Sequence, residues 1–257
     1  MSQSELQFLD VGSGPSARSI AVRHEAGSSP GVLWLSGFKS DMSGSKAEEV
    51  ARHARDQGQR VTRFDYSGHG RSGGDFEQAC LSDWLEETLA VFDLFCTQPT
   101  LVVGSSMGGW LAMLLALARK ETGRIDGLVL IAPALDFTEE LMWKQRFTPG
   151  IREIVLRDGR FEQPSAYSGE PYVITKKLIE DGRNHLLLGT SLHTGCPVTI
   201  LQGIQDPDVP WQHAQRLVAA LPQDDVVFTL VPDGDHRLSR PQDIDLLLKA
   251  IDRLRAS

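Results

Sequence analysis

The sequence predicts an α/β protein with a mostly parallel sheet that is flanked by helices. Two observations lead to this class. Short runs of β-branched and apolar residues alternate with segments of helical length, and 257 residues is an ordinary length for one α/β domain. The hydrophobic fraction of 41% and the charged fraction of 23% are typical of a globular chain. We therefore expect a single domain over residues 1–257.

Eight runs have the length and composition of strands. They span residues 6–11, 18–24, 32–35, 60–65, 100–104, 127–132, 198–203 and 226–231. The first two precede any helical segment, so we expect them to form an antiparallel edge of the sheet. Five segments with helical periodicity separate or follow the later strands. They span residues 45–57, 81–96, 107–119, 211–221 and 241–254.

The alternation stops between residues 133 and 197. This stretch contains several prolines and glycines, with only short amphipathic pieces such as residues 173–180. A segment of this length without regular structure is usually a lid or a binding loop. We therefore expect a small lid insertion at about 133–197.

The charge and the cysteines exclude several classes of protein. The net charge is −8, and the lysines and arginines are scattered, so a nucleic-acid partner is not expected. No run of about 18 apolar residues occurs, so no membrane span is expected. Three widely spaced cysteines, without a C-x-x-C pair, favour free thiols in a reducing compartment and no metal site.

The stretch VVGSSMGG at residues 102–109 connects a predicted strand directly to a predicted helix. Gly104 and Gly108 lie two positions before and after Ser106, as in an elbow that presents a nucleophilic serine on a tight turn. The alternative is a structural turn or a phosphate-binding loop. No lysine follows as in a phosphate-binding Walker loop. Ser106 is therefore the candidate nucleophile.

A serine nucleophile needs a general base and an acid that orients the base. In this type of fold they follow in the order Ser, acid, His, on loops at the carboxyl ends of the last strands. Asp206 lies on the loop after residues 198–203, and His236 lies on the loop after residues 226–231. Asp208 has an alternative explanation as a turn residue. We predict Asp206 as the acid and His236 as the base.

An acyl-transfer site also needs donors for the oxyanion. The expected donors are the backbone N–H groups of Met107, which follows the nucleophile, and of Phe38, in the loop after the third strand. Trp110, Trp143 and Tyr167 lie near or within the predicted lid and are candidates for substrate binding. Packing of the lid against the body is the alternative role for each of them.

Together the stretches LSGFKSDMSGSKA, RFDYSGHGRS, VGSSMGGW, QGIQDPDVPW and GDHR resemble an α/β-hydrolase. The stretches YSGEPYVITKKLIEDGRNHLLL and DHRLSRPQDIDLL resemble, more closely, the palmitoyl-protein thioesterase and acyl-glucuronide esterase branch. This resemblance implies a serine hydrolase with the triad Ser106, Asp206 and His236 and without a cofactor or metal. Its expected partner is a small-molecule acyl ester or thioester, or an acylated protein.

Two positions depart from the pattern of the superfamily. Ser36 and Gln202 stand where many members have histidine, so the transfer of a substrate is less secure than the transfer of the chemistry. Animal members of the branch are mitochondrial, but no transit segment is evident, so a cytoplasmic location is expected. Two alternatives stay open: the same triad acting on a peptide, lactone or carbon–carbon bond, and a non-catalytic binding protein. The sequence does not indicate the oligomeric state.

Overall fold

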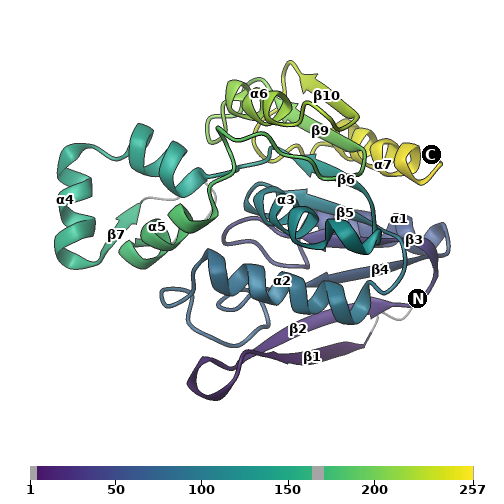
Figure 1. Cartoon of the computed structure of the whole chain (residues 1–257), viewed down its shortest axis with the longest axis horizontal. Helices are drawn as coiled ribbons and strands as arrows, with labels where there is room; N and C mark the ends of the chain where they lie inside the picture. The colour runs from purple at the N-terminus through teal and green to yellow at the C-terminus, as the bar shows by residue number, and fades with distance from the viewer. Residues whose placement is uncertain (1–4, 164–170, 257) are drawn as a thin grey trace.

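An eight-stranded sheet forms the centre of the molecule (Figure 1). The structure is a computed structural model that describes residues 5–163 and 171–256. The strands are β1 (Leu6–Val11), β2 (Arg18–Glu25), β3 (Ser28–Leu35), β4 (Gln59–Phe64), β5 (Thr100–Ser105), β6 (Ile125–Ile131), β9 (Val198–Gly203) and β10 (Val226–Val231). Their order is β1-β2-β4-β3-β5-β6-β9-β10. The predicted fold class is confirmed, and β1 forms the expected antiparallel edge with β2.

The strands that carry the candidate site residues are parallel to their neighbours. Among the described strands of the eight-stranded sheet, only the β1–β2 and β2–β4 pairs are antiparallel. From β4 to β10 every neighbouring pair is parallel. The carboxyl ends of β3, β5, β9 and β10 therefore lie at one edge of the sheet, and the loops that follow them meet there.

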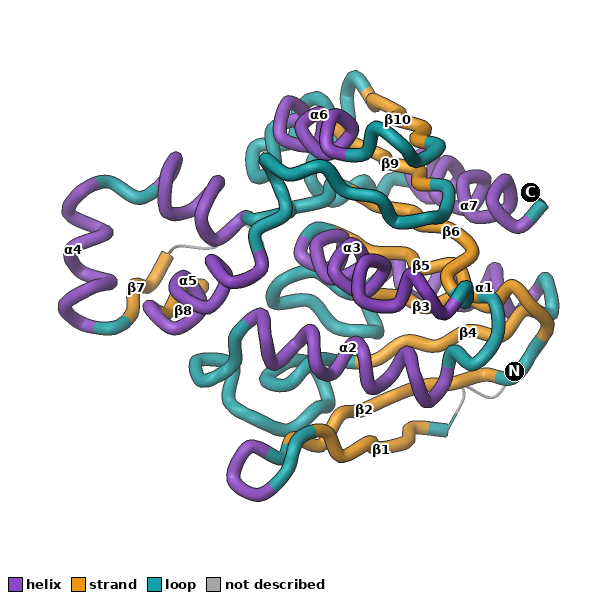
Figure 2. The backbone as a smooth tube through the Cα atoms, in the orientation of Figure 1, coloured by secondary structure: helices purple, strands orange, loops and turns teal. Residues whose placement is uncertain are grey.

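Helices cover both faces of the sheet. They are α1 (Ser45–Asp56), α2 (Leu81–Phe95), α3 (Met107–Arg119), α6 (Trp211–Ala220) and α7 (Pro241–Arg255). One hydrophobic cluster joins α2, α3 and α6 to the sheet, and a second joins α1 and α7 to the opposite face. Figure 2 shows α2 and α3 crossing in front of the strands. Because both faces are covered, central strands such as β5 consist entirely of buried residues.

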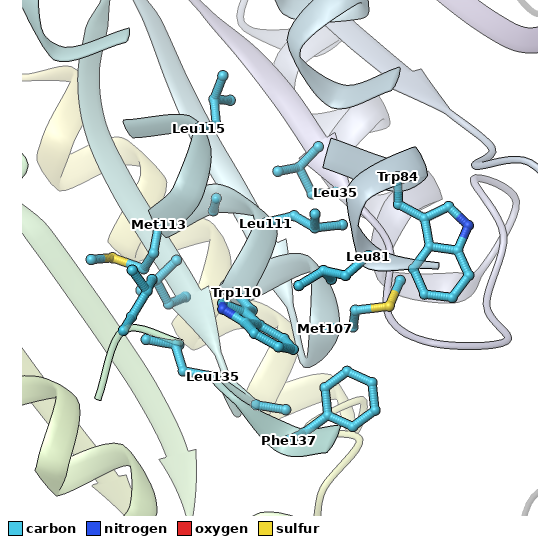
Figure 3. Close-up of a cluster of buried hydrophobic side chains, with 14 of the residues drawn as sticks. Leu35, Leu81, Trp84, Met107, Trp110, Leu111, Met113, Leu115, Leu135 and Phe137 are labelled. Atoms are coloured by element: carbon cyan, nitrogen blue, oxygen red, sulfur yellow. The ribbon is translucent and has the colours of Figure 1, made fainter. Parts of the chain in front are cut away.

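The core beneath the candidate site is built largely by α2 and α3. Figure 3 shows Leu81 and Trp84 from α2 beside Met107, Trp110 and Leu111 from α3. All five side chains are buried. The start of α3, which follows Ser106 directly, is therefore held by dense apolar packing.

The segment between β6 and β9 contains more regular structure than the sequence indicates. We call residues 133–197 the lid segment. Its elements are the π-helix η3 (Thr138–Arg146), α4 (Pro149–Asp158), β7 (Arg160–Gln163), β8 (Tyr172–Thr175), α5 (Lys176–Gly182) and the 3-10 turn η4 (Arg183–His185). Among the described strands, β7 and β8 pair with each other in a separate two-stranded sheet. The piece 173–180, expected to be one amphipathic unit, is divided between β8 and α5. In Figure 1 most of these elements lie to the left of the sheet.

Asp136 joins the two ends of the lid segment. Its buried carboxylate accepts hydrogen bonds from the backbone N–H groups of Leu187 and Leu188, at 2.8 to 3.1 Å. Burial raises the pKa of Asp136, while these backbone donors lower it. The residues that lead into and out of the lid segment are therefore tied together beside the sheet. No helix in residues 5–163 or 171–256 is long and apolar enough to cross a membrane.

Candidate active site

Ser106 lies on a strained turn between β5 and α3. Its φ of 56° and ψ of −116° are unusual for a residue with a side chain, and its N–H donates to the carbonyl of Ile131 at 2.8 Å. A Cβ on Gly104 would lie 2.3 Å from the carbonyl oxygen of Gly108, and a Cβ on Gly108 would lie 2.1 Å from that of Leu35. The turn can therefore form only with glycine at both flanking positions.

The structure brings together the three side chains predicted for acid, base and nucleophile. Nε2 of His236 lies 3.1 Å from Oγ of Ser106, and Nδ1 of His236 lies 2.8 Å from Oδ2 of Asp206. The three residues come from the loops after β10, β5 and β9. Contacts of this length allow a proton to move between the hydroxyl and the imidazole while the carboxylate orients the ring.

Asp206 is held by four hydrogen bonds. Its Oδ1 accepts from the N–H groups of Asp208 and Val209, both at 2.8 Å. Its Oδ2 faces His236 at 2.8 Å and accepts from Nε2 of Gln202 at 3.1 Å. Ligand atoms of Asp206, Asp208 and His236 lie within 4.8 Å of one another, as a metal site would require. The four donors already use the acceptor positions of the Asp206 carboxylate, so a metal could bind there only after a rearrangement.

Gln202 is a contributor to the site that sequence reasoning did not assign. It is fully buried in β9, and its Nε2 also lies 2.9 Å from the carbonyl oxygen of Val209 and 3.1 Å from that of Gly203, so its two hydrogens are shared among these two carbonyls and the carboxylate of Asp206. One side chain thus links the strand, the loop after it and the carboxylate of Asp206. The signal in the sequence is a long amide side chain next to the last residue of the predicted strand VTILQG.

Ser36, the other departure from the superfamily pattern, lies at the end of β3 and lines the cavity. It is buried, and its Oγ accepts a hydrogen bond from Nε1 of Trp34 at 3.0 Å. Its hydroxyl therefore satisfies a buried indole donor next to the loop that carries Phe38.

The two predicted oxyanion donors lie on either side of Ser106. Met107 is the first residue of α3, where backbone N–H groups have no partner within the helix. Phe38 follows Gly37, at which a Cβ would lie 3.2 Å from the carbonyl oxygen of Ser105 and 3.3 Å from Cβ of Ser106. The loop therefore approaches the serine closely. Both Phe38 and Met107 line the cavity at Ser106.

His69 supports the loop that carries Phe38. Its Nε2 accepts a hydrogen bond from the N–H of Lys39 at 3.1 Å, so Nδ1 carries the proton that is donated to the carbonyl of Ser67 at 3.1 Å. Lys39 has a φ of 58°, another sparsely populated conformation. Burial lowers the pKa of His69 to about 4. The loop after β4 therefore contributes a neutral histidine that fixes the residue after Phe38.

A cavity of about 510 Å³ opens over Ser106 and His236. Part of its lining is apolar and comes from the loop after β3 and the lid segment: Phe38, Phe137, Leu141, Met142 and Tyr172. The ring centroid of Phe38 lies 5.7 Å from that of Phe137 and 6.1 Å from that of Tyr172. Four cationic side chains also line the cavity: Lys39, Lys46, Arg146 and Arg237.

The structure places the two described tryptophans proposed for substrate binding outside the lining of this cavity. Trp110 is fully buried, and its Nε1 donates to the carbonyl of His185 at 3.1 Å, so it holds α3 against the lid segment. Trp143 lines a separate, open hollow on the lid segment and lies 5.6 Å from the guanidinium of Arg152 and 5.1 Å from that of Arg183. Tyr167 lies outside the described residues.

The comparison with protein families gives a match to the model described as serine aminopeptidase, S33, over residues 31–185. Among curated proteins, the mitochondrial palmitoyl-protein thioesterase ABHD10 of Homo sapiens is 33% identical over 254 residues, which is 98% of this chain and 80% of that protein. The Mus musculus protein of the same name is 33% identical over 98% of this chain and 83% of its own length.

Solved structures of similar proteins include hydrolases as well. A putative hydrolase from Agrobacterium vitis S4 is 48% identical with a TM-score of 0.94, and the match covers 98% of each chain. The mouse α/β-hydrolase domain-containing protein 10 is 31% identical with a TM-score of 0.87, again over 98% of each chain. The family match spans more than half of the chain and agrees with these neighbours. The chain belongs to the serine aminopeptidase S33 family and has the α/β-hydrolase fold.

Proposed function

We propose that this protein is a serine hydrolase that cleaves acyl ester or thioester bonds through Ser106, His236 and Asp206. The observation that carries the proposal is the continuous chain of contacts, 3.1 Å and 2.8 Å long, that runs from a strained serine to a buried carboxylate in one cavity. The thioesterase names of the relatives support the same class of substrate. No step in the proposed reaction requires a cofactor.

In the proposed reaction His236 acts first as base and then as acid. Nε2 of His236 takes the proton of Ser106 while Oγ attacks the acyl carbonyl, and a tetrahedral oxyanion forms. The carbon–oxygen or carbon–sulfur bond then breaks, and His236 gives its proton to the leaving alcohol or thiol. Water, activated by the same nitrogen, hydrolyses the acyl-serine and restores the enzyme. Asp206 keeps the ring of His236 oriented and stabilises its positive charge.

The N–H groups of Phe38 and Met107 are the proposed donors to the oxyanion. Removing one donor of this kind typically costs about 10² to 10³ in rate. His69 supports this arrangement because it holds the N–H of Lys39, one residue beyond Phe38. The backbone at Gly37 approaches Ser105 and Ser106 closely, and this approach favours a position of the two donors near Oγ of Ser106.

The acyl group is proposed to lie against the apolar part of the cavity, around Phe38, Phe137 and Tyr172. These rings come from the loop after β3 and from the lid segment, so the lid segment is proposed to help select the acyl group. We also propose that residues 1–257 form a single domain and that residues at about 133–197 form its lid. The cytoplasmic location stays a prediction, since the relatives are named as mitochondrial.

Hydrolysis of nitrophenyl esters and thioesters with short to long acyl chains tests this function. Wild type is compared with Ser106→Ala and with Ser105→Ala, which removes only the neighbouring hydroxyl. We expect turnover and fluorophosphonate labelling to disappear together in Ser106→Ala and to persist in Ser105→Ala. A wild type that neither labels nor hydrolyses any of these substrates would overturn the proposal and favour a binding protein.

A further inference from the structure

Lys46 is a cation in an unfavourable place that the proposed mechanism does not use. It is partly buried and lies in the first turn of α1, where the partial positive charge of the helix terminus opposes a cation. Gly44, at the N-cap, offers no side chain to the first N–H groups. Within residues 5–163 and 171–256, no carboxylate forms an ion pair with Lys46. Asp206, Asp235 and Asp243 act on this charge only from beyond ion-pair distance, so an anionic ligand in contact with Nζ would stabilise it further.

The surroundings of Lys46 place it on the His236 side of the cavity. Its Nζ donates to the carbonyl of Arg237, the residue that follows His236. Ser45, Lys46 and Arg237 all line the cavity that contains Ser106. The side chain of Arg237 is exposed and adds a second positive charge.

Among the described lining residues, the four cations outnumber the carboxylates. Asp41 and Asp208 are the acidic side chains among the described lining residues. Asp208 already has a cationic neighbour, since its carbonyl accepts a hydrogen bond from Arg146 and its Oδ1 lies 3.8 Å from that guanidinium. This excess of positive charge among the described lining residues, in a protein of net charge −8, favours an anionic group of the substrate.

The mechanism decides which part of the substrate carries this group. The apolar rings cluster around Phe38, which suits an acyl chain, whereas Lys46 lies next to the loop of His236. In the proposed reaction His236 gives its proton to the leaving alcohol or thiol. We therefore propose, on the basis of the proposed function, that Lys46 and Arg237 bind an anionic group, a carboxylate or a phosphate, on the leaving group of the substrate.

The protonation of Lys46 adds a second prediction. Burial lowers the pKa of Lys46 to about 8, and the charge of Arg237 lowers it further, whereas Asp235, Asp243 and Asp206 raise it. The ammonium is present below pH 8 and is lost as the pH rises through that value. Preference for an anionic leaving group therefore falls between pH 7 and pH 9.

Matched thioesters test this proposal. Three substrates carry the same hexanoyl group on a neutral thiol (N-acetylcysteamine), a carboxylated thiol (mercaptopropionate) and a phosphorylated thiol (phosphopantetheine). The readout is the ratio of kcat/KM for each anionic substrate to that for the neutral one. The proteins are wild type, Lys46→Gln, Lys46→Arg and the control Lys249→Gln, which removes an exposed lysine that is paired with Asp245 on α7.

We expect wild type to have a higher kcat/KM for at least one anionic thioester than for the neutral one. Whether the carboxylated or the phosphorylated thioester is preferred shows which anionic group is bound. Lys46→Gln lowers that ratio about tenfold, as expected when one partly exposed ammonium no longer contacts the anionic group of the substrate. Lys46→Arg keeps most of the ratio, and Lys249→Gln keeps all of it. An equal ratio in wild type and Lys46→Gln would overturn the role of Lys46 while leaving the proposed function intact.

Two further measurements distinguish a failure of the Lys46 proposal from a failure of the proposed function. If Lys46→Gln does not fold, the ratio in Arg237→Gln, which changes an exposed side chain, decides, and a ratio equal to that of wild type refutes the proposal. Failure of wild type to hydrolyse any of the three thioesters or to label with a fluorophosphonate would overturn the proposed function and this inference with it.

Discussion

Gly108 is the residue at which the elbow is most sensitive to a single added atom. In Gly108→Ala the new Cβ would lie 2.1 Å from the carbonyl oxygen of Leu35, about 0.9 Å short of the 3.0 Å that Cβ atoms keep. The next nearest atoms, at 2.6 and 2.7 Å, are also backbone atoms of Leu35 and Ser36. No flexible side chain can move aside, so the start of α3 must separate from the end of β3.

This displacement acts directly on Ser106 and Met107, which precede Gly108. A shift of about 1 Å in a reacting group can reduce the rate about 100-fold. Overpacking of this kind typically costs about 1 to 3 kcal/mol. In a chain of this length each kcal/mol lowers Tm by roughly 2 to 4 °C, so we expect Tm to fall by roughly 2 to 12 °C.

The assay for Gly108→Ala combines the rate of fluorophosphonate labelling with a thermal melt. The control is Gly150→Ala in α4, where the nearest atom to the added Cβ is 4.0 Å away. This control replaces glycine by a better helix former, so we expect Tm to stay the same or to rise slightly. If Gly108→Ala labels at the wild-type rate, the conclusion that the turn requires glycine at this position is refuted.

Three further predictions concern residues around Ser106. Asp206→Asn lowers kcat for a nitrophenyl ester about 10⁴-fold, because His236 loses the carboxylate that orients it. Gln202→Leu lowers kcat about tenfold in the same assay, since Asp206 loses a donor 3.1 Å away. In wild type the free energy of unfolding, measured with urea, falls by up to about 3 kcal/mol as the pH drops from 6.5 to 4, because unfolding releases His69 from a site that holds its pKa at about 4. In His69→Asn this fall is smaller.

Each of these predictions has a contrary result. Wild-type turnover in Asp206→Asn would exclude Asp206 as the residue that orients His236. An unchanged kcat in Gln202→Leu would reduce Gln202 to a packing role. The same loss of stability between pH 6.5 and pH 4 in wild type and His69→Asn would show that other groups cause the loss.

Sequence patterns located the elements whose signals are local. Strands β1, β9 and β10 begin and end at the predicted residues, because each is a short segment rich in β-branched, aromatic and aliphatic residues. The lid segment was different. Strands β7 and β8 have four residues each and are stabilised by pairing with each other, so neither carries a strong pattern of its own. The π-helix η3 has no simple periodicity that would identify it.

The sequence by itself predicted the α/β class, which the structure confirms, and selected Ser106, Asp206 and His236 as candidates, since a tight turn and the loops after particular strands leave few choices for these residues. Only the tertiary structure decided what the surrounding side chains contact. The sequence predicts that Trp110 binds substrate, but its side chain packs in the core. Gln202 lies within a strand, and its side chain contacts Asp206. Such contacts depend on the direction of each side chain after packing, and no local pattern encodes that direction.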